Sequence, residues 1–231
     1  NIWKKKNIKI IEDATEALGS KIKRGRFAQK FLGTIGDIGC LSFNGNKIIT
    51  SGGGGMLLLK KKTLDERARY YISQCKDNAE LFIHNDVGYN FSLSNLNAAF
   101  GLAQLKHLDK IINKKKKIFN TYKLKFQKLK NFSFFTFSPT LKNNYWMNIL
   151  RTKKNKYHLK KKILSEFKKV GIEARSVWYP NHIQKPFLKY QRYYISNANK
   201  IFKSSICLPS SYSLTKEDQL KVINVIKKLD V

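Results

Sequence analysis

The sequence predicts an α/β fold, because segments with the apolar pattern of strands alternate with segments of helical period. Residues 8–12 (IKIIE) are a β-branched run followed by Asp13 and small residues, as expected for a buried parallel strand. Residues 94–130 carry apolar residues at helical spacing instead. With 231 residues, 42% of them apolar, the chain is long enough to bury a core.

Further elements of the first half follow from local patterns. Strands are expected at 37–44 (DIGCLSFN) and 55–60 (GMLLLK), so that three strand ends and the glycine-rich segment holding Lys47 converge on one rim. A helix is expected to begin at Thr63, because Glu66 stands three residues later in the capping-box position. Residues 94–130 predict one long helix or two in series, whose apolar stripe is Leu96, Ala99, Phe100, Ala103, Leu105, Leu108 and Ile111.

After Asn131 the pattern changes to short strands and helices. The segments FSFFTF, YWMNILR and IEARSVWY indicate strands, and residues 158–171 indicate a helix. A last helix is expected from Thr215 as N-cap. We place a domain boundary near residue 120, so that residues 1–119 belong to a larger domain and 120–231 to a smaller α/β domain.

The composition narrows the class of protein. A net charge of +31 raises a nucleic-acid hypothesis, but the excess is mainly lysine spread along the whole chain, which favours solvated helix faces.

No apolar run reaches the roughly 18 residues of a membrane span, so we expect a soluble protein. Cys40, Cys75 and Cys207 lack the paired spacing of a metal site, which favours reduced thiols, no bound metal and a cytoplasmic location. Because the chain begins at Asn1 directly before a strand, we expect it to be the later part of a longer protein.

Asp13 and Lys47 form a candidate catalytic pair. A carboxylate at a strand end and a lysine at a glycine-rich turn suit a cofactor that needs a protonated pyridine nitrogen and a Schiff base. By themselves the residues leave two plainer interpretations open. Asp13 can instead anchor a loop, and Lys47 can be one more solvated lysine.

Five segments carry a resemblance to a known family. They are IIEDATEALGS, GTIGDIGCLSFNGNKIITSGGGGMLLL, VGYNFSLSNLNAAFGLAQL, GIEARSVWYPNHIQKPF and CLPSSYSLTKEDQ. In this order they resemble the DegT/DnrJ/EryC1/StrS family of pyridoxal-phosphate-dependent sugar aminotransferases, closest to the legionaminic acid and bacillosamine type. The resemblance implies the aspartate-aminotransferase-like fold type I, represented here by part of the large domain and the small C-terminal domain. It covers about the C-terminal three-fifths of such a protein.

The resemblance implies roles for particular residues. Lys47 matches the lysine that holds pyridoxal 5′-phosphate as a Schiff base and moves the substrate proton. Asp13 matches the carboxylate that pairs with the pyridine nitrogen, and Ser42 matches a hydroxyl that binds the phosphate. Asn90 matches an asparagine that reaches the cofactor phosphate of a neighbouring subunit, which implies a homodimer with shared active sites.

Two positions depart from the family pattern, and a glycine run needs its own explanation. Glu16 stands where many members have a glutamine that bonds the cofactor's phenolic oxygen. An ionised glutamate there would repel that oxygen, so Glu16 either is protonated, points away from the oxygen or marks a subgroup. Ser92 stands where many members have an arginine, which puts substrate contacts in doubt. Glycines 52–55 let the backbone approach the cofactor closely, or they form a plain flexible turn.

The later segment supplies candidate substrate contacts. Trp178, Tyr179, His182 and Lys185 lie where the family's small domain faces the active-site entrance, where such residues could stack on a base or contact a diphosphate. Ordinary packing of the aromatic rings and a surface histidine are the plainer interpretation.

The function that the resemblance implies is transfer of an amino group from an amino acid, glutamate in most of the family, to a keto-sugar nucleotide in cell-surface polysaccharide biosynthesis. Lys47 favours this transfer, because dehydratase relatives have histidine at that position. Two alternatives remain open: a basic, noncatalytic protein that binds nucleic acid or an anionic surface, and a catalytically silent regulatory member of the family.

Overall fold

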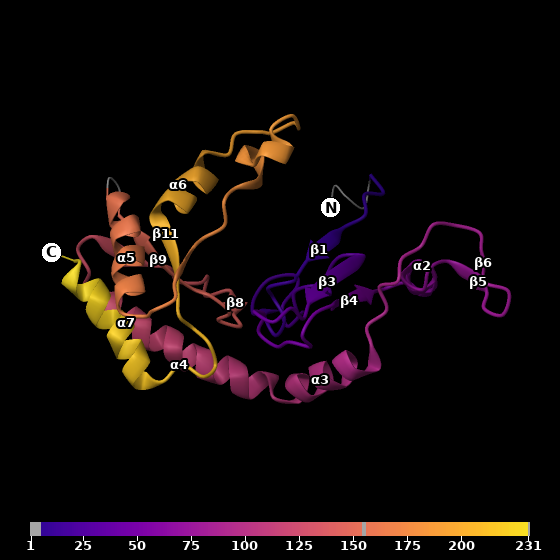
Figure 1. Cartoon of the computed structure of the whole chain (residues 1–231), viewed down its shortest axis with the longest axis horizontal. Helices are drawn as coiled ribbons and strands as arrows, with labels where there is room; N and C mark the ends of the chain where they lie inside the picture. The colour runs from indigo at the N-terminus through magenta and orange to yellow at the C-terminus, as the bar shows by residue number, and fades with distance from the viewer. Residues whose placement is uncertain (1–5, 154–155, 231) are drawn as a thin grey trace. The chain divides into compact units, whose positions relative to one another are not determined.

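The structure is a computed structural model that describes residues 6–153 and 156–230 (Figure 1). The chain divides into two compact units. Unit 1 comprises residues 1–112 and 138–144, and unit 2 comprises residues 113–137 and 145–231. The division falls inside the helix that runs from residue 108 to 126, the same helix that holds the boundary predicted near residue 120.

Unit 1 is built around a three-stranded sheet of order β1-β3-β4. Strands β1 (Ile11–Asp13) and β3 (Ile38–Ser42) are parallel, and β4 (Gly55–Leu59) is antiparallel to β3. Figure 1 shows the three strands side by side. Two small antiparallel pairs accompany them: β2 (Lys21–Ile22) with β8 (Leu141–Lys142), and β5 (Lys76–Asn78) with β6 (Ile83–His84). The predicted parallel pairing and convergence of strand ends are confirmed.

Three helices follow β4 along the chain: α2 (Lys62–Ile72), α3 (Asn95–Lys106) and α4 (Leu108–Phe126). The prediction of two helices in series is confirmed. Ser94 caps α3, and its Oγ accepts the Asn97 amide at 3.3 Å. The predicted start of α2 is wrong, because Lys61 is the N-cap and Thr63 already lies within the helix.

Burial in unit 1 differs from what the sequence predicts. Strand β1 was expected to be buried, yet Ile11 and Asp13 are exposed. No residue of α3 is buried, although Leu96 and Phe100 belong to the predicted apolar stripe. The spacing of apolar residues indicates which face of a helix or strand they share. It does not indicate whether another element packs on that face.

Unit 2 is an antiparallel sheet of order β10-β11-β9-β7 with helices packed on it. The strands are β7 (Phe132–Phe134), β9 (Asn148–Thr152), β10 (Arg175–Ser176) and β11 (Ser205–Leu208). The helices are α5 (His158–Lys169), α6 (Ser196–Ser204), α7 (Lys216–Lys228) and the short 3₁₀ helices η1 (Asn181–Ile183) and η2 (Lys185–Phe187). The predicted cap is confirmed, because Thr215 Oγ1 accepts the Asp218 amide at 3.0 Å.

The core of unit 2 joins the second half of α4 to the sheet and to α5 and α7. Its members include Ile118, Tyr122, Phe126, Phe132, Leu150, Ile163, Phe167, Ile206, Val222 and Ile226. Two polar groups of α4 hold the segment that follows β11: Tyr122 donates its hydroxyl to the Pro209 carbonyl at 3.0 Å, and Lys115 donates to the Ser210 carbonyl at 2.7 Å. These bonds satisfy carbonyl groups that would otherwise be buried without partners.

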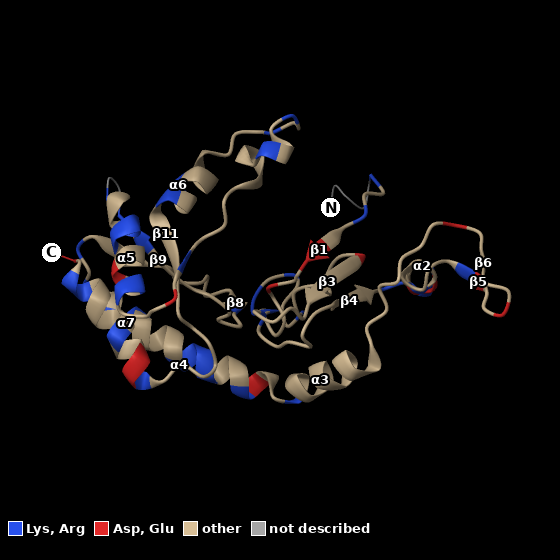
Figure 2. Cartoon of the chain, in the orientation of Figure 1, with Lys and Arg blue, Asp and Glu red and all other residues tan. Residues whose placement is uncertain are grey.

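Basic residues dominate the helices of unit 2. Figure 2 shows Lys and Arg on α4, α5 and α7 with few acidic residues among them. Most of these side chains are exposed, as solvated helix faces require. The three cysteines are free thiols, as predicted. Within the described ranges, no helix combines the length and the apolar composition that crossing a bilayer demands.

Lys115 makes the stability of unit 2 pH-dependent. Burial lowers its pKa to about 8 from 10.5, so between these values the unfolded chain binds a proton that the native chain does not. Stability therefore rises with pH in this window. Relative to Lys115→Met, the unmodified protein should gain about 2.5 kcal/mol in free energy of unfolding between pH 7 and pH 10, measured by urea denaturation. Lys116→Met, which alters an exposed neighbour and keeps Lys115, should gain stability with pH as the unmodified protein does. Equal pH slopes for the unmodified protein and Lys115→Met would contradict the prediction.

Candidate functional site

The parallel pairing of β1 with β3 brings the predicted site residues to one edge of the sheet. Asp13 lies opposite Cys40, and the Ala14 amide donates to the Cys40 carbonyl at 3.0 Å. Strand β3 continues to Ser42, which pairs with Gly55 at the start of β4. Asp13, Ser42 and the loop that contains Lys47 therefore lie at the same edge.

Lys47 sits on a loop that its own hydrogen bonds fix tightly. Its amide donates to the Asn44 carbonyl at 3.0 Å. Phe43 closes the loop: its amide donates to Gly54 and its carbonyl accepts the Ser51 amide, each at 3.0 Å. Because Ile48 and Ile49 after the lysine are buried, the lysine is anchored from both sides.

The Lys47 amine contacts the carboxylate of Glu16. Nζ forms an ion pair with Glu16 Oε1, and the side chains are 11% and 46% exposed, respectively. Glu16 therefore points toward the lysine. An ion pair with one half-exposed member is stabilised by charge attraction and only partly screened by solvent.

Asp13 faces the same lysine from the strand end. Thr15 donates to Asp13 Oδ1 through its hydroxyl at 2.7 Å and through its amide at 3.3 Å. These bonds lower the pKa of Asp13, and the positive charge of Lys47 lowers it further. Asp13 is thus held as a carboxylate.

The glycines around the site serve turns and close backbone contacts. Gly52 and Gly54 have φ of +83° and +77°, the left-handed region that side chains disfavour. A Cβ at Gly39 would stand 1.8 Å from the Gly33 carbonyl oxygen, so only glycine fits at this position of β3. For Gly52 and Gly54, the turn itself is therefore sufficient reason for glycine.

Two residues that the sequence did not single out support this edge. Glu12 accepts the amides of Gly33 at 2.9 Å and of Ile35 and Gly36 at 2.5 Å, which fastens the segment between β2 and β3. Asn144 donates through Nδ2 to the carbonyls of Glu16 at 2.8 Å and Leu18 at 3.0 Å. No sequence signal could have found Asn144, because its contacts lie more than 120 residues away along the chain.

The other unit 1 candidates occupy two different places. Ser42 Oγ accepts the Asn44 amide at 3.5 Å and can still donate its own proton. Asn90 is exposed and forms a bridge with Ser73, just after α2. Among the described residues, no hydrogen bond or ion pair joins Asn90 to Asp13, Ser42 or Lys47. Ser92 donates to the Ile72 carbonyl at 3.4 Å.

The candidates of unit 2 follow β10 along the chain. Trp178 stacks on Trp146, with ring centroids 6.0 Å apart, and Tyr179 contacts Phe202 edge-on at 5.1 Å. The His182 carbonyl accepts an N–H of Arg192 at 3.2 Å, and Lys185 is exposed. Packing explains one face of each aromatic ring, but Trp178 remains 62% exposed.

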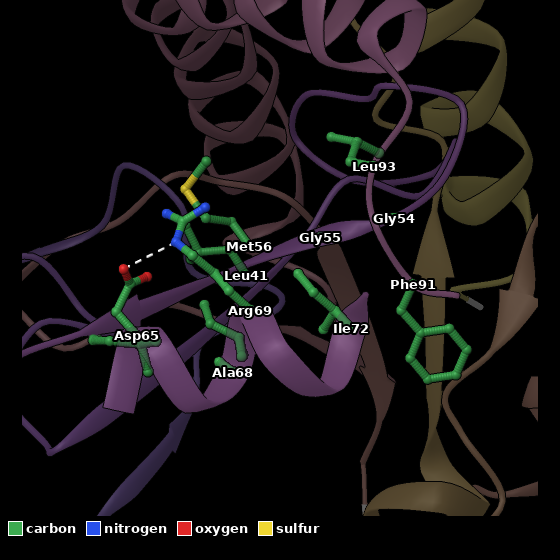
Figure 3. Close-up of a pocket in the computed structure, with 12 residues that line it drawn as sticks. Leu41, Gly54, Gly55, Met56, Asp65, Ala68, Arg69, Ile72, Phe91 and Leu93 are labelled. Carbon is green, nitrogen blue, oxygen red and sulfur yellow. Dashed lines mark hydrogen bonds and ion pairs between the residues drawn. The ribbon is translucent and has the colours of Figure 1, made fainter. Parts of the chain in front are cut away.

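A separate apolar groove of about 570 Å³ runs along β4 and α2 (Figure 3). Met56, Ala68, Ile72, Phe91 and Leu93 line it, and the Asp65–Arg69 ion pair at 2.9 Å closes one end. Gly54 and Gly55 of the glycine run also line this groove, whereas Asp13, Glu16, Ser42, Lys47 and Asn90 do not.

The donor set at the sheet edge fits a phosphorylated aldehyde better than a metal ion. It offers one largely buried amine on Lys47, two carboxylates on Asp13 and Glu16, and the hydroxyl of Ser42. Within the part of the chain that the structure describes, no three His, Cys, Asp or Glu side chains gather closely enough to hold a metal.

Comparison with known proteins decides the family. The profile of the DegT/DnrJ/EryC1/StrS aminotransferase family matches residues 1–227. The chain belongs to this family. The resemblance of the five segments to this family is thereby confirmed. Lys47 lies within the matched residues.

Relatives and solved structures agree with this assignment. The chain is 36% identical over 229 residues to EpsN of Bacillus subtilis strain 168, a provisionally assigned pyridoxal phosphate-dependent aminotransferase; the match covers 96% of this chain and 56% of EpsN. It is 36% identical over 228 residues to GDP-perosamine synthase of Escherichia coli O157:H7, covering 97% and 59%. Helicobacter pylori PseC, an aminotransferase of pseudoaminic acid biosynthesis, superposes with a TM-score of 0.89 at 22% identity, covering 99% and 61%. The chain shares the fold of these aminotransferases and spans somewhat under two thirds of their length.

Asn144 should stabilise the folded conformation of the segment that carries Glu16. Asn144→Ala removes two hydrogen bonds to that segment and should lower the free energy of unfolding by about 1–3 kcal/mol, measured by urea denaturation. Faster proteolysis between residues 14 and 20 should accompany the loss. Asn224→Ala, at an exposed position of α7, should change stability by less than about 0.5 kcal/mol. Equal effects of the two variants would contradict the assigned role.

Proposed function

We propose that the protein to which this chain belongs is a pyridoxal-phosphate-dependent aminotransferase that acts on a keto-sugar nucleotide. The observation that carries the proposal is the placement of Lys47 at the sheet edge where Asp13 ends β1 and Ser42 ends β3. Membership of the family and the names of the relatives support it.

Each residue has a task that its surroundings allow. When bound, pyridoxal phosphate supplies an electron sink that stabilises negative charge on the substrate carbon. Asp13 would pair with the ring nitrogen, a task that suits a carboxylate held ionised by Thr15. The Ser42 hydroxyl would donate to the phosphate. Lys47 would attach the cofactor through its amine and, once released, move the proton at the substrate carbon.

The substrate assignments come from the relatives. GDP-perosamine synthase, with 36% identity, and the Campylobacter jejuni UDP-4-amino-4,6-dideoxy-N-acetyl-beta-L-altrosamine transaminase, with 26%, are named for nucleotide-linked amino sugars. We therefore assign an amino acid, glutamate in the simplest case, as donor, a keto-sugar nucleotide as acceptor, and cell-surface polysaccharide biosynthesis as the process. Trp178, Tyr179, His182 and Lys185 would contact the nucleotide.

The assembly and the location form part of the same proposal. Asn90 lies exposed on unit 1 and would reach the cofactor phosphate of a second subunit in a homodimer with shared active sites. We place the enzyme in the cytoplasm, where its three free thiols stay reduced.

Replacing Lys47 should abolish cofactor attachment. Mixed with pyridoxal 5′-phosphate, the full-length protein should develop visible absorbance that borohydride bleaches, and Lys47→Ala should develop none, because the amine that forms the covalent bond is gone. Lys62→Ala, which removes an exposed lysine of α2, should behave as the unmodified protein. If Lys47→Ala kept the full absorbance, the assignment of the attachment site would be wrong.

Turnover separates an active enzyme from a catalytically silent family member. The loaded protein should lose its visible absorbance when glutamate is added and regain it when a keto-sugar nucleotide follows. Asp13→Asn should lower kcat by roughly 10²-fold or more, because it removes charge stabilisation at the ring nitrogen. A loaded protein that never responds to amino donors would favour the silent role, whereas salt-sensitive binding of nucleic acid without absorbance would favour the basic binding protein.

A further inference from the structure

The indole ring of Trp178 is open to solvent and yet supported on one side. Trp178 is 62% exposed, although a large aromatic ring gains much from burial. Its ring stacks on that of Trp146, with centroids 6.0 Å apart and ring planes 25° apart. Trp146 therefore covers one part of this ring, while the rest offers a flat apolar surface to a ligand.

Trp146 is the buried member of this pair, and its backbone is fixed. It is only 8% exposed, so it offers almost no surface to a ligand itself. Its carbonyl accepts the Ser210 hydroxyl at 3.2 Å and Lys115 Nζ at 3.4 Å. Two residues later the chain enters β9, which pairs with both β7 and β11. The support under Trp178 is thus tied to α4 and to the sheet of unit 2.

The charge of the segment that carries Trp178 favours an anionic ligand. Residues 174–216 include no Asp or Glu. Lys185 and Arg192 follow Trp178 in this segment, and both are exposed. An exposed aromatic ring suits a flat ring of a ligand, and exposed cations suit phosphate oxygens. A nucleoside diphosphate combines these two features.

Resting on the proposed function, we propose that the base of the keto-sugar nucleotide stacks on the exposed surface of Trp178, and that Trp146 is a positioning residue that fixes this ring before the nucleotide binds. Every base has a flat π face that can stack on an aromatic side chain. A ring that is held in advance loses less conformational entropy on binding. Trp146 thus acts on the nucleotide only through Trp178.

Binding to the full-length protein tests the stacking, measured by calorimetry with GDP, UDP and dTDP as probes. Trp178→Ala should weaken binding of the tightest of the three by about 5- to 150-fold, the loss of one stacking contact. Binding of inorganic pyrophosphate, which has the charge but no base, should stay unchanged. Tyr212→Ala, which removes an exposed aromatic ring between β11 and α7, should change neither affinity.

Replacing Trp146 tests the positioning role. Trp146→Leu keeps an apolar side chain but should weaken binding of the same nucleotide by about 2- to 12-fold, because Trp178 must then be ordered on binding. Trp146→Phe, which keeps a ring for stacking, should restore most of the affinity. In a protein that already carries Trp178→Ala, Trp146→Leu should cause no further loss, because the residue through which Trp146 acts is gone.

Four results would overturn the inference. They are an unmodified protein that binds none of the three nucleotides, an unchanged nucleotide affinity of Trp178→Ala, an equal loss of pyrophosphate affinity in that variant, and additive losses in the double variant. A merely structural role of Trp146 would give the additive losses and would leave Trp146→Phe as weak as Trp146→Leu. Failure of the proposed function is seen separately, since the unmodified protein would then develop no visible absorbance with pyridoxal 5′-phosphate.

Discussion

The parallel pairing of β1 with β3 is the constraint on which the arrangement of the candidate site depends. It sets Asp13 opposite Cys40 and carries the chain from Ala14 directly into the segment that holds Thr15 and Glu16. The pairing tolerates only glycine at position 39, because the Gly33 carbonyl occupies the space of a side chain there. Glu12 fixes the same region through three backbone amides. A displaced β3 would therefore move Asp13, Ser42 and the Lys47 loop together.

Lys47 is distinguished from the other lysines by its surroundings rather than by its chemistry. Many lysines of this +31 chain lie on solvated helix faces. Lys47 is largely buried, is bonded through its backbone within a closed loop, and faces two carboxylates. Lys115 is buried as well, yet its partners are backbone carbonyls, which makes it a structural bond to the segment after β11.

The sequence predicted elements and their ends better than it predicted contacts. The strand that ends at Asp13, the cap at Thr215 and the alternative of two helices in series follow from local patterns, because backbone hydrogen bonding and apolar period act over a few residues. The strand expected at 37–44 ends at Ser42 instead. The start of α2 was wrong, since a capping-box spacing at Thr63 does not exclude an earlier turn. Burial was harder to predict than the elements themselves. Strand β1 and helix α3 have apolar patterns, but the exposure of their side chains depends on which other elements pack against them.

In the candidate site, too, residues could be predicted from local sequence, whereas their long-range contacts could not. Asp13 and Lys47 could be named from residue type and spacing, and their common edge follows from the parallel pairing. The contact between Glu16 and Lys47 crosses 31 residues, and the bonds of Asn144 to the Glu16 segment cross more than 120. Such contacts arise from the tertiary structure, and no local pattern in the sequence encodes them.

Peptide mapping tests the central claim, that one lysine among many holds the cofactor. The full-length protein is loaded with an equimolar amount of pyridoxal 5′-phosphate at neutral pH, reduced with borohydride, digested and examined by mass spectrometry. The account predicts that the reduced cofactor is attached to Lys47 in nearly all modified peptides. A distribution over the exposed lysines of α4, α5 and α7, with no preference for Lys47, would contradict it.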